Sequence, residues 1–200
     1  MKSLLTILLF FIIPVIGFSQ ELDYIAELTK TLKSESIIDS TDKQIYSLMD
    51  DFFNENLQTN NPTLSENTIK KFQSLLMNEK SKNHHLLGLF AIYQKHISES
   101  IETGKTIPNL QVKLMETLAN EYKAIYNSVP VLIYIYLIEA YNASKQIDKA
   151  ALVLEESRQL YPDAIPLKVY QYMSTKDEKL KEDIVQNHAD HWLVKRFNIN

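Results

Sequence analysis

The chain has 200 residues, 45% of them hydrophobic and 23% charged, which is the composition of a folded globular protein. Non-specific binding of nucleic acid needs clustered Lys and Arg side chains that neutralise phosphates. A chain with a net charge of −4 and no basic stripe does not offer them, so no nucleic-acid partner is expected. The absence of cysteine excludes disulfides, thiolate metal sites and a cysteine nucleophile, and three glycines with six prolines are too few for the many turns of an all-β fold.

The first 19 residues have the pattern of a secretory signal peptide. Lys2 is followed by an apolar run over 4–18. The small residues Gly17 and Ser19 stand three and one positions before Gln20, as at a signal-peptidase cleavage site. An apolar run of about 15 residues that contains Pro14 is shorter than the roughly 20 needed to cross a bilayer. We therefore predict cleavage after Ser19, export to the periplasm or out of the cell, and no stable membrane insertion of the remaining domain, 20–200.

The segment 21–107 predicts a series of amphipathic helices, because apolar residues recur at spacings of three and four. The first predicted helix contains the apolar positions of 22–32. The second runs to about Leu57, and Thr41 with Gln44 is predicted to form a capping box at its start.

Two further helices are expected before the middle of the chain. Thr63 and Glu66 offer a second capping box, directly after a proline that breaks the preceding helix. The next helix is predicted over about 84–101, with Gly104 ending it.

A fifth helix is predicted to begin at Pro108. The run that follows, 131–138, is rich in β-branched and aromatic residues and in isolation would favour a buried strand. It continues without a turn signal to Ala143, however, and Pro130 precedes it. A proline suits the first turn of a helix, so we predict a buried helix here.

An internal repeat organises the C-terminal half, 108–200. The segment 125–130 resembles 160–166, about 35 positions later, and a period near 34 is that of the tetratricopeptide repeat. Residues between the two segments match the motif positions of that family: Tyr134, Leu137, Ile138 and Tyr141 in the first helix, then Ala150, Leu154 and Pro162.

The segment 131–164 therefore resembles one tetratricopeptide repeat. The resemblance implies a right-handed α-solenoid of stacked antiparallel helix pairs, clearest in 131–164 and degenerate over 21–107. Ile138 stands where the family prefers glycine, and Ser157 where it prefers alanine, so the packing of the pair is expected to differ there. Because one pair cannot bury its apolar face alone, the earlier helices are expected to join the same stack, with a helix near Trp192 as a cap.

The sequence predicts no catalytic, cofactor or metal site. It has neither the usual serine-hydrolase motifs nor a glycine-rich phosphate loop. His84 and His85 are adjacent and diverge on a helix, whereas His188 and His191 have the i, i+3 spacing of a metal pair but no evident third ligand.

The resemblance also indicates a binding face. Once Tyr134 and Tyr141 face inward, Ile135, Glu139 and Asn142 share a neighbouring face of the same helix, which lines the concave groove in the resembled family. These side chains are expected to hold an extended peptide, with Glu139 favouring a basic group. The alternative is that Glu139 and Asn142 are only the polar side of a solvated helix.

We therefore expect an exported, non-enzymatic interaction module that binds a peptide or protein partner in the cell envelope on its concave face. Two other functions remain open. A hydrolase would gather several acids with perturbed pKa values in one deep pocket, and a helical carrier would enclose an apolar cavity.

Overall fold

The computed structural model describes residues 18–200, with side-chain surroundings from residue 24 onward, and in this range the chain forms ten α-helices. They are α2 (Phe18–Ser34), α3 (Gln44–Phe52), α4 (Glu66–Met77), α5 (His84–Thr103), α6 (Pro108–Tyr126), α7 (Val131–Ala143), α8 (Ile147–Leu160), α9 (Ile165–Thr175), α10 (Glu178–His188) and α11 (Trp192–Arg196), with a π-helical turn, η1 (Phe53–Leu57), directly after α3. The all-α prediction is confirmed.

The predicted leader, 1–19, lies almost wholly outside the described residues, so its cleavage after Ser19 stays a prediction. Within 18–200, none of the helices is both long enough and apolar enough to cross a membrane.

The predicted capping box at the start of α3 is wrong. The helix begins at Gln44, and Lys43 precedes it without a side-chain cap. Asp42 accepts a hydrogen bond from the backbone N–H of Gln44 at 2.9 Å, and Asp39 accepts the backbone N–H of Thr41, also at 2.9 Å. Two aspartates, both charged acceptors, therefore take the roles that the pattern gave to a threonine and a glutamine.

The capping box predicted for α4 is also wrong. The N-cap is Ser65, whose hydroxyl accepts from the N–H of Thr68 at 3.2 Å, and Thr63 takes no part. Glu55 in η1 accepts the backbone N–H of Ser65 at 2.7 Å, so a carboxylate from another turn sets where this helix starts. Local spacing cannot reveal a cap partner that lies ten residues upstream.

Two helix ends and the helical state of one segment follow the sequence signals. Gly104 ends α5 in the left-handed conformation, with φ of 66°, and Pro108 occupies the first turn of α6. The run 131–138 is part of the helix α7, as predicted. This helix is hydrophobic around almost its whole circumference because α3, α6 and α8 all pack against it.

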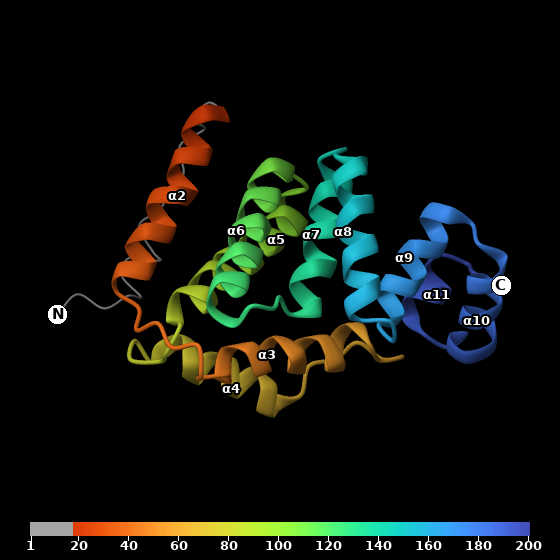
Figure 1. Cartoon of the computed structure of the whole chain (residues 1–200), viewed down its shortest axis with the longest axis horizontal. Coiled ribbons are helices and arrows are strands. Elements are labelled where there is room, and N and C mark those ends of the chain that lie inside the picture. The colour runs from red at the N-terminus through yellow and green to blue at the C-terminus, as the bar shows by residue number, and fades with distance from the viewer. Residues whose placement is uncertain (1–17) are drawn as a thin grey trace.

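Helices that follow one another in the chain mostly lie side by side. Figure 1 shows an upright row from α2 through α5 and α6 to α7 and α8, continued by α9 to α11, while α3 runs across beneath the row. The first helix of the described residues, α2, packs on both α5 and α6, and α3 reaches as far as α7. Because α3 crosses the row, the fold departs from a uniform stack of helix pairs.

The interior consists of two apolar clusters. The larger one is built from α2 to α8 together with Leu167 of α9, and the smaller one lies among α9, α10 and α11 around Val169, Ile184 and Val194. Tyr170 and Trp192 contact both clusters. The last three helices therefore have a small core of their own, and α9 joins them to the main body by packing on α8.

The end of η1 holds this C-terminal unit in place. The Nε2–H of the fully buried His191 donates to the carbonyl of Leu57 at 2.9 Å. The side chain of Gln58 donates to the carbonyl of Asp163 at 2.8 Å and accepts from the N–H of Ile165 at 2.9 Å. One short segment thus positions the starts of both α9 and α11.

We expect His191→Ala to lower the free energy of unfolding by roughly 1 to 3 kcal/mol, because it leaves a buried carbonyl and the N–H of Leu193 without partners. His188→Ala is the matched control and is expected to cost much less, since His188 is only partly buried and makes neither bond. Urea denaturation measures both variants. Equal costs would show that the bond from His191 to Leu57 does not hold the unit.

The same histidine should make stability depend on pH. Burial lowers the pKa of His191, so below about pH 6.5 the unfolded chain takes up a proton that the folded chain refuses. The stability that neutral His191 contributes to the folded protein is therefore fully present above about pH 6.5, and it is lost as the pH falls through the lowered pKa of His191. The difference in unfolding free energy between wild type and His191→Ala should shrink over this range.

Two glycines should respond to alanine with opposite signs. At Gly88, inside α5, a Cβ would lie 3.5 Å from a methyl group of Leu32 on α2, which is ordinary contact, so Gly88→Ala should stabilise by roughly 0.5 to 1 kcal/mol. At Gly104 the positive φ penalises a side chain, so Gly104→Ala should destabilise by about 1 kcal/mol. Denaturation midpoints check both, and a destabilising Gly88→Ala would contradict the packing of α2 on α5.

Candidate functional site

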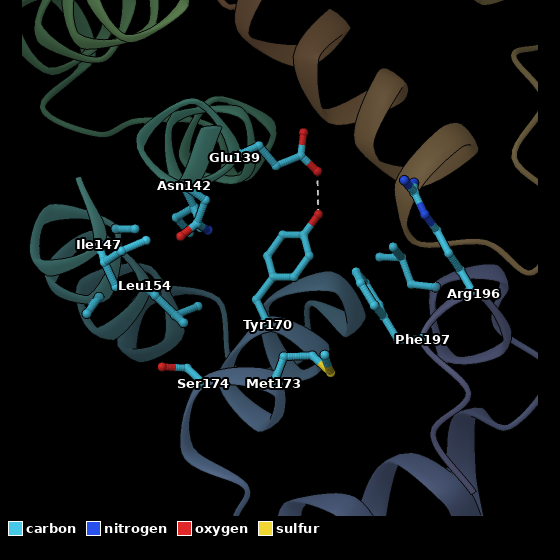
Figure 2. Close-up of a pocket in the computed structure, with 13 residues that line it drawn as sticks. Glu139, Asn142, Ile147, Leu154, Tyr170, Met173, Ser174, Arg196 and Phe197 are labelled. Atoms are coloured by element: carbon cyan, nitrogen blue, oxygen red, sulfur yellow. Dashed lines mark hydrogen bonds between the residues drawn. The ribbon is translucent and has the colours of Figure 1, made fainter. Parts of the chain in front are cut away.

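A hollow of about 570 Å³ opens between α7, α8, α9 and α11, and Figure 2 shows the side chains around it. We call it the α7–α11 groove. It is lined by Ile138, Glu139, Asn142, Ile147, Ala150, Ala151, Leu154, Tyr170, Met173, Ser174, Leu193, Arg196 and Phe197.

Each helix contributes a different kind of side chain to this groove. The one exposed strip of α7 presents Glu139 and Asn142, which are three positions apart and therefore share a face. Ile147 and Leu154 form an apolar wall on α8. The facing side comes from α9 and from the end of α11, and it carries both apolar side chains, Met173 and Phe197, and polar ones, Ser174 and Arg196.

The carboxylate of Glu139 is the most constrained charge in the groove. The hydroxyl of Tyr170 donates a hydrogen bond to Glu139 Oε1, drawn as a dashed line in Figure 2. The side chain is reached by solvent, yet it lies in a hollow where protein atoms replace part of its hydration. That desolvation raises the pKa of Glu139, while the bond from Tyr170 and the positive charge of Arg196 act in the opposite direction.

Aromatic rings from α5 and α7 lie near this carboxylate. Tyr136 stacks on Phe90, with ring centroids 6.4 Å apart, and its ring centroid lies 5.5 Å from that of Tyr93. Burial raises the pKa of both phenols, and the negative charge of Glu139 raises it further, to about 12 for Tyr136. These phenols are therefore neutral at physiological pH.

Arg196 is the other charge that faces the groove. Within the described part of the chain, its guanidinium makes no ion pair and no hydrogen bond, with Glu139 or with any other residue. It lowers the pKa of Glu139 and of Tyr170 only through its charge. An unpaired arginine and a carboxylate therefore border the same hollow.

Apolar side chains are left exposed at two places along the groove. Ile147 is 58% exposed and Phe197 is 36% exposed, although both are large and hydrophobic. Single exposed apolar residues are common on proteins, but these two line one hollow together with Leu154 and Met173. The groove thus offers apolar surface that a ligand could cover.

Of the three residues predicted for the binding face, Glu139 and Asn142 line the groove. Ile135 lies one turn earlier on the same face of α7, but it is fully buried in the main core and does not line the groove. The prediction for Ile135 has to be corrected, because the neighbouring helices cover α7 at this turn and leave the face open only at Glu139 and Asn142. Sequence reasoning missed Tyr170, Met173, Arg196 and Phe197, and no local pattern points to them.

Two of the histidines that were considered as metal ligands make structural hydrogen bonds. His191 bonds to Leu57, as described above, and the Nε2–H of His84 donates to the carbonyl of Leu76 at 2.9 Å. Over the residues whose placement is described, no three histidine, aspartate or glutamate side chains are grouped as a metal site requires.

One other cluster has the order of a serine–histidine–acid chain. Ser36 Oγ lies 3.2 Å from His85 Nδ1, and His85 Nε2 lies 3.3 Å from Glu121 Oε2. His85 is fully buried, however, Ser36 Oγ also accepts the backbone N–H of His85, and Glu121 forms an ion pair with Lys33 at 2.6 Å. Since a nucleophile and its base must reach a substrate, we interpret this cluster as a link between α2, α5 and α6.

Comparison of the chain with protein-family models, with curated proteins and with solved structures finds no significant match. The fold therefore identifies the protein only as an all-α protein, whose ten helices between residues 18 and 200 pack mostly on their neighbours in sequence. A function has to be inferred from the groove itself.

We expect Tyr170→Phe to raise the pKa of Glu139 further, because the hydroxyl that stabilises the ionised carboxylate is lost. The carboxyl ¹³C resonance of Glu139, followed against pH, measures this change. Tyr172→Phe on the same helix is the control, since Tyr172 does not line the groove. An unchanged titration in Tyr170→Phe would remove the hydrogen bond from the description of the site.

Proposed function

We propose that this protein is an exported, non-enzymatic interaction module that binds a peptide or protein partner of the cell envelope in the α7–α11 groove. The observation that carries the proposal is the combination of exposed apolar walls with hydrogen-bonding groups that have no partner among the described residues. The amide of Asn142 and the second oxygen of Glu139 are such groups. An extended peptide presents backbone N–H and C=O groups that these side chains can bond.

We further propose that α7 and α8 are a tetratricopeptide-like helix pair. In support, its motif residues are buried, including Tyr134, Tyr141 and Ala150. Ser157, which departs from the family pattern, is fully buried, but its hydroxyl donates to the carbonyl of Leu154 at 3.1 Å. A serine that satisfies its own hydroxyl can replace the small alanine at this position.

The groove favours this proposal over the two alternatives. Hydrolysis of the glycosidic kind uses two carboxylates, whereas Glu139 is the one carboxylate that lines the groove. A carrier of an apolar molecule would surround its ligand with apolar side chains, whereas three of the helices around this hollow present polar groups to it, including Asn142, Ser174 and Arg196. A groove that combines apolar and polar side chains suits a peptide.

We expect Glu139→Lys to abolish peptide binding while the melting temperature changes little, because the reversed charge repels a basic group. Binding is measured on an array of random extended peptides with the purified protein. Glu155→Lys on α8 is the matched control, because Glu155 is exposed and lies outside the groove. If Glu139→Lys and wild type bind the same peptides with the same affinity, the groove is not the binding surface.

A further inference from the structure

The two charges of the groove face the same space without meeting. Glu139 projects from α7 and Arg196 from α11, and no ion pair joins them. In Figure 2 the ring of Phe197 stands between Tyr170 and Arg196, while Ile147 and Leu154 lie on the opposite side of Tyr170. Along the groove, the order is therefore an apolar slot, a carboxylate and a guanidinium.

Each of these parts has unused binding capacity. Tyr170 engages one oxygen of Glu139, and the other oxygen is free to accept from a donor. Arg196 has donors without acceptors among the described residues, and Ile147 remains 58% exposed beside Leu154. Unlike charges on two helices that border the same hollow produce a field with a direction, and that field favours a ligand whose charges run the opposite way.

We propose that the groove recognises an extended peptide segment with three side chains in a fixed order: an apolar one for the slot, a basic one for Glu139 and an acidic one for Arg196. This inference rests on the proposed function and adds the polarity of the ligand to it. In an extended chain, alternate side chains point to the same side and lie about 7 Å apart. The motif is therefore apolar–x–basic–x–acidic, in either chain direction.

Arg196 is the residue that determines specificity in this arrangement. Glu139 alone would accept any basic segment, including one with several adjacent lysines. A guanidinium next to it repels a second positive charge and attracts a negative one, so segments with mixed charge are selected over purely basic ones.

The test compares peptides of identical composition. Capped nine-residue peptides carry Leu-Ser-Lys-Ser-Glu or Leu-Ser-Glu-Ser-Lys at their centre, each also made in the reverse chain direction, and fluorescence anisotropy measures their affinities. Wild type should bind the Leu-Ser-Lys-Ser-Glu peptide, in one of its two chain directions, at least about tenfold more tightly than it binds Leu-Ser-Glu-Ser-Lys in either direction. The double variant Glu139→Lys with Arg196→Glu, which keeps the net charge, should show the reverse preference.

Single variants separate this proposal from general charge effects. Arg196→Gln should lose most of the discrimination at the acidic position. Lys195→Gln removes an equal charge from the same helix, but Lys195 pairs with Asp190 outside the groove, so it should keep the wild-type preference. If the double variant does not fold, these two single variants decide the question.

Failure of the proposed charge order and failure of peptide binding itself would give different results. Equal binding of all peptides by wild type, or equal effects of Arg196→Gln and Lys195→Gln, would overturn the polarity while leaving peptide binding in the groove intact. If wild type binds neither these peptides nor any on the random array, the proposed function fails and the polarity fails with it.

Discussion

The hydrogen bonds at the end of η1 are the constraint on which the groove depends. The carbonyl of Leu57 and the side chain of Gln58 engage the starts of α11 and α9, more than 100 positions later in the chain. A π-helical turn changes the direction of the last backbone groups relative to an α-helix, and it occurs where α3 ends beneath the row. Because the C-terminal unit has its own small core, these bonds and the packing of α9 on α8 position it against the main body.

The position of the C-terminal unit, α9 to α11, gives α7 one enclosed side and one side that borders the groove. Most of α7 is enclosed by α3, α6 and α8, while the strip with Glu139 and Asn142 faces the gap that α9 and α11 border. A carboxylate in such a gap loses hydration, and Tyr170 with Arg196 offsets part of that cost. The same contacts orient Glu139 along the groove, so the interactions that stabilise the charge also prepare it for a ligand.

The helices themselves could be predicted from local sequence, because the signals for them are local. Pro108 and Gly104 mark helix ends through backbone geometry alone, and the length of the apolar run after Pro130 decides between helix and strand. The caps of α3 and α4 could not be predicted as reliably. Acidic side chains compete for the same N–H groups, and one of them, Glu55, belongs to another turn.

For the candidate site, the sequence by itself determined that Glu139 and Asn142 share one face, because three residues of helix bring two side chains to the same side. Only the tertiary structure decided that Ile135 is buried and that Tyr170, Arg196 and Phe197 complete the groove. The physical reason is the range of the interactions. Helical periodicity repeats within four residues, whereas which face of a helix is covered depends on segments brought together by bonds such as that from His191 to Leu57, 134 positions apart.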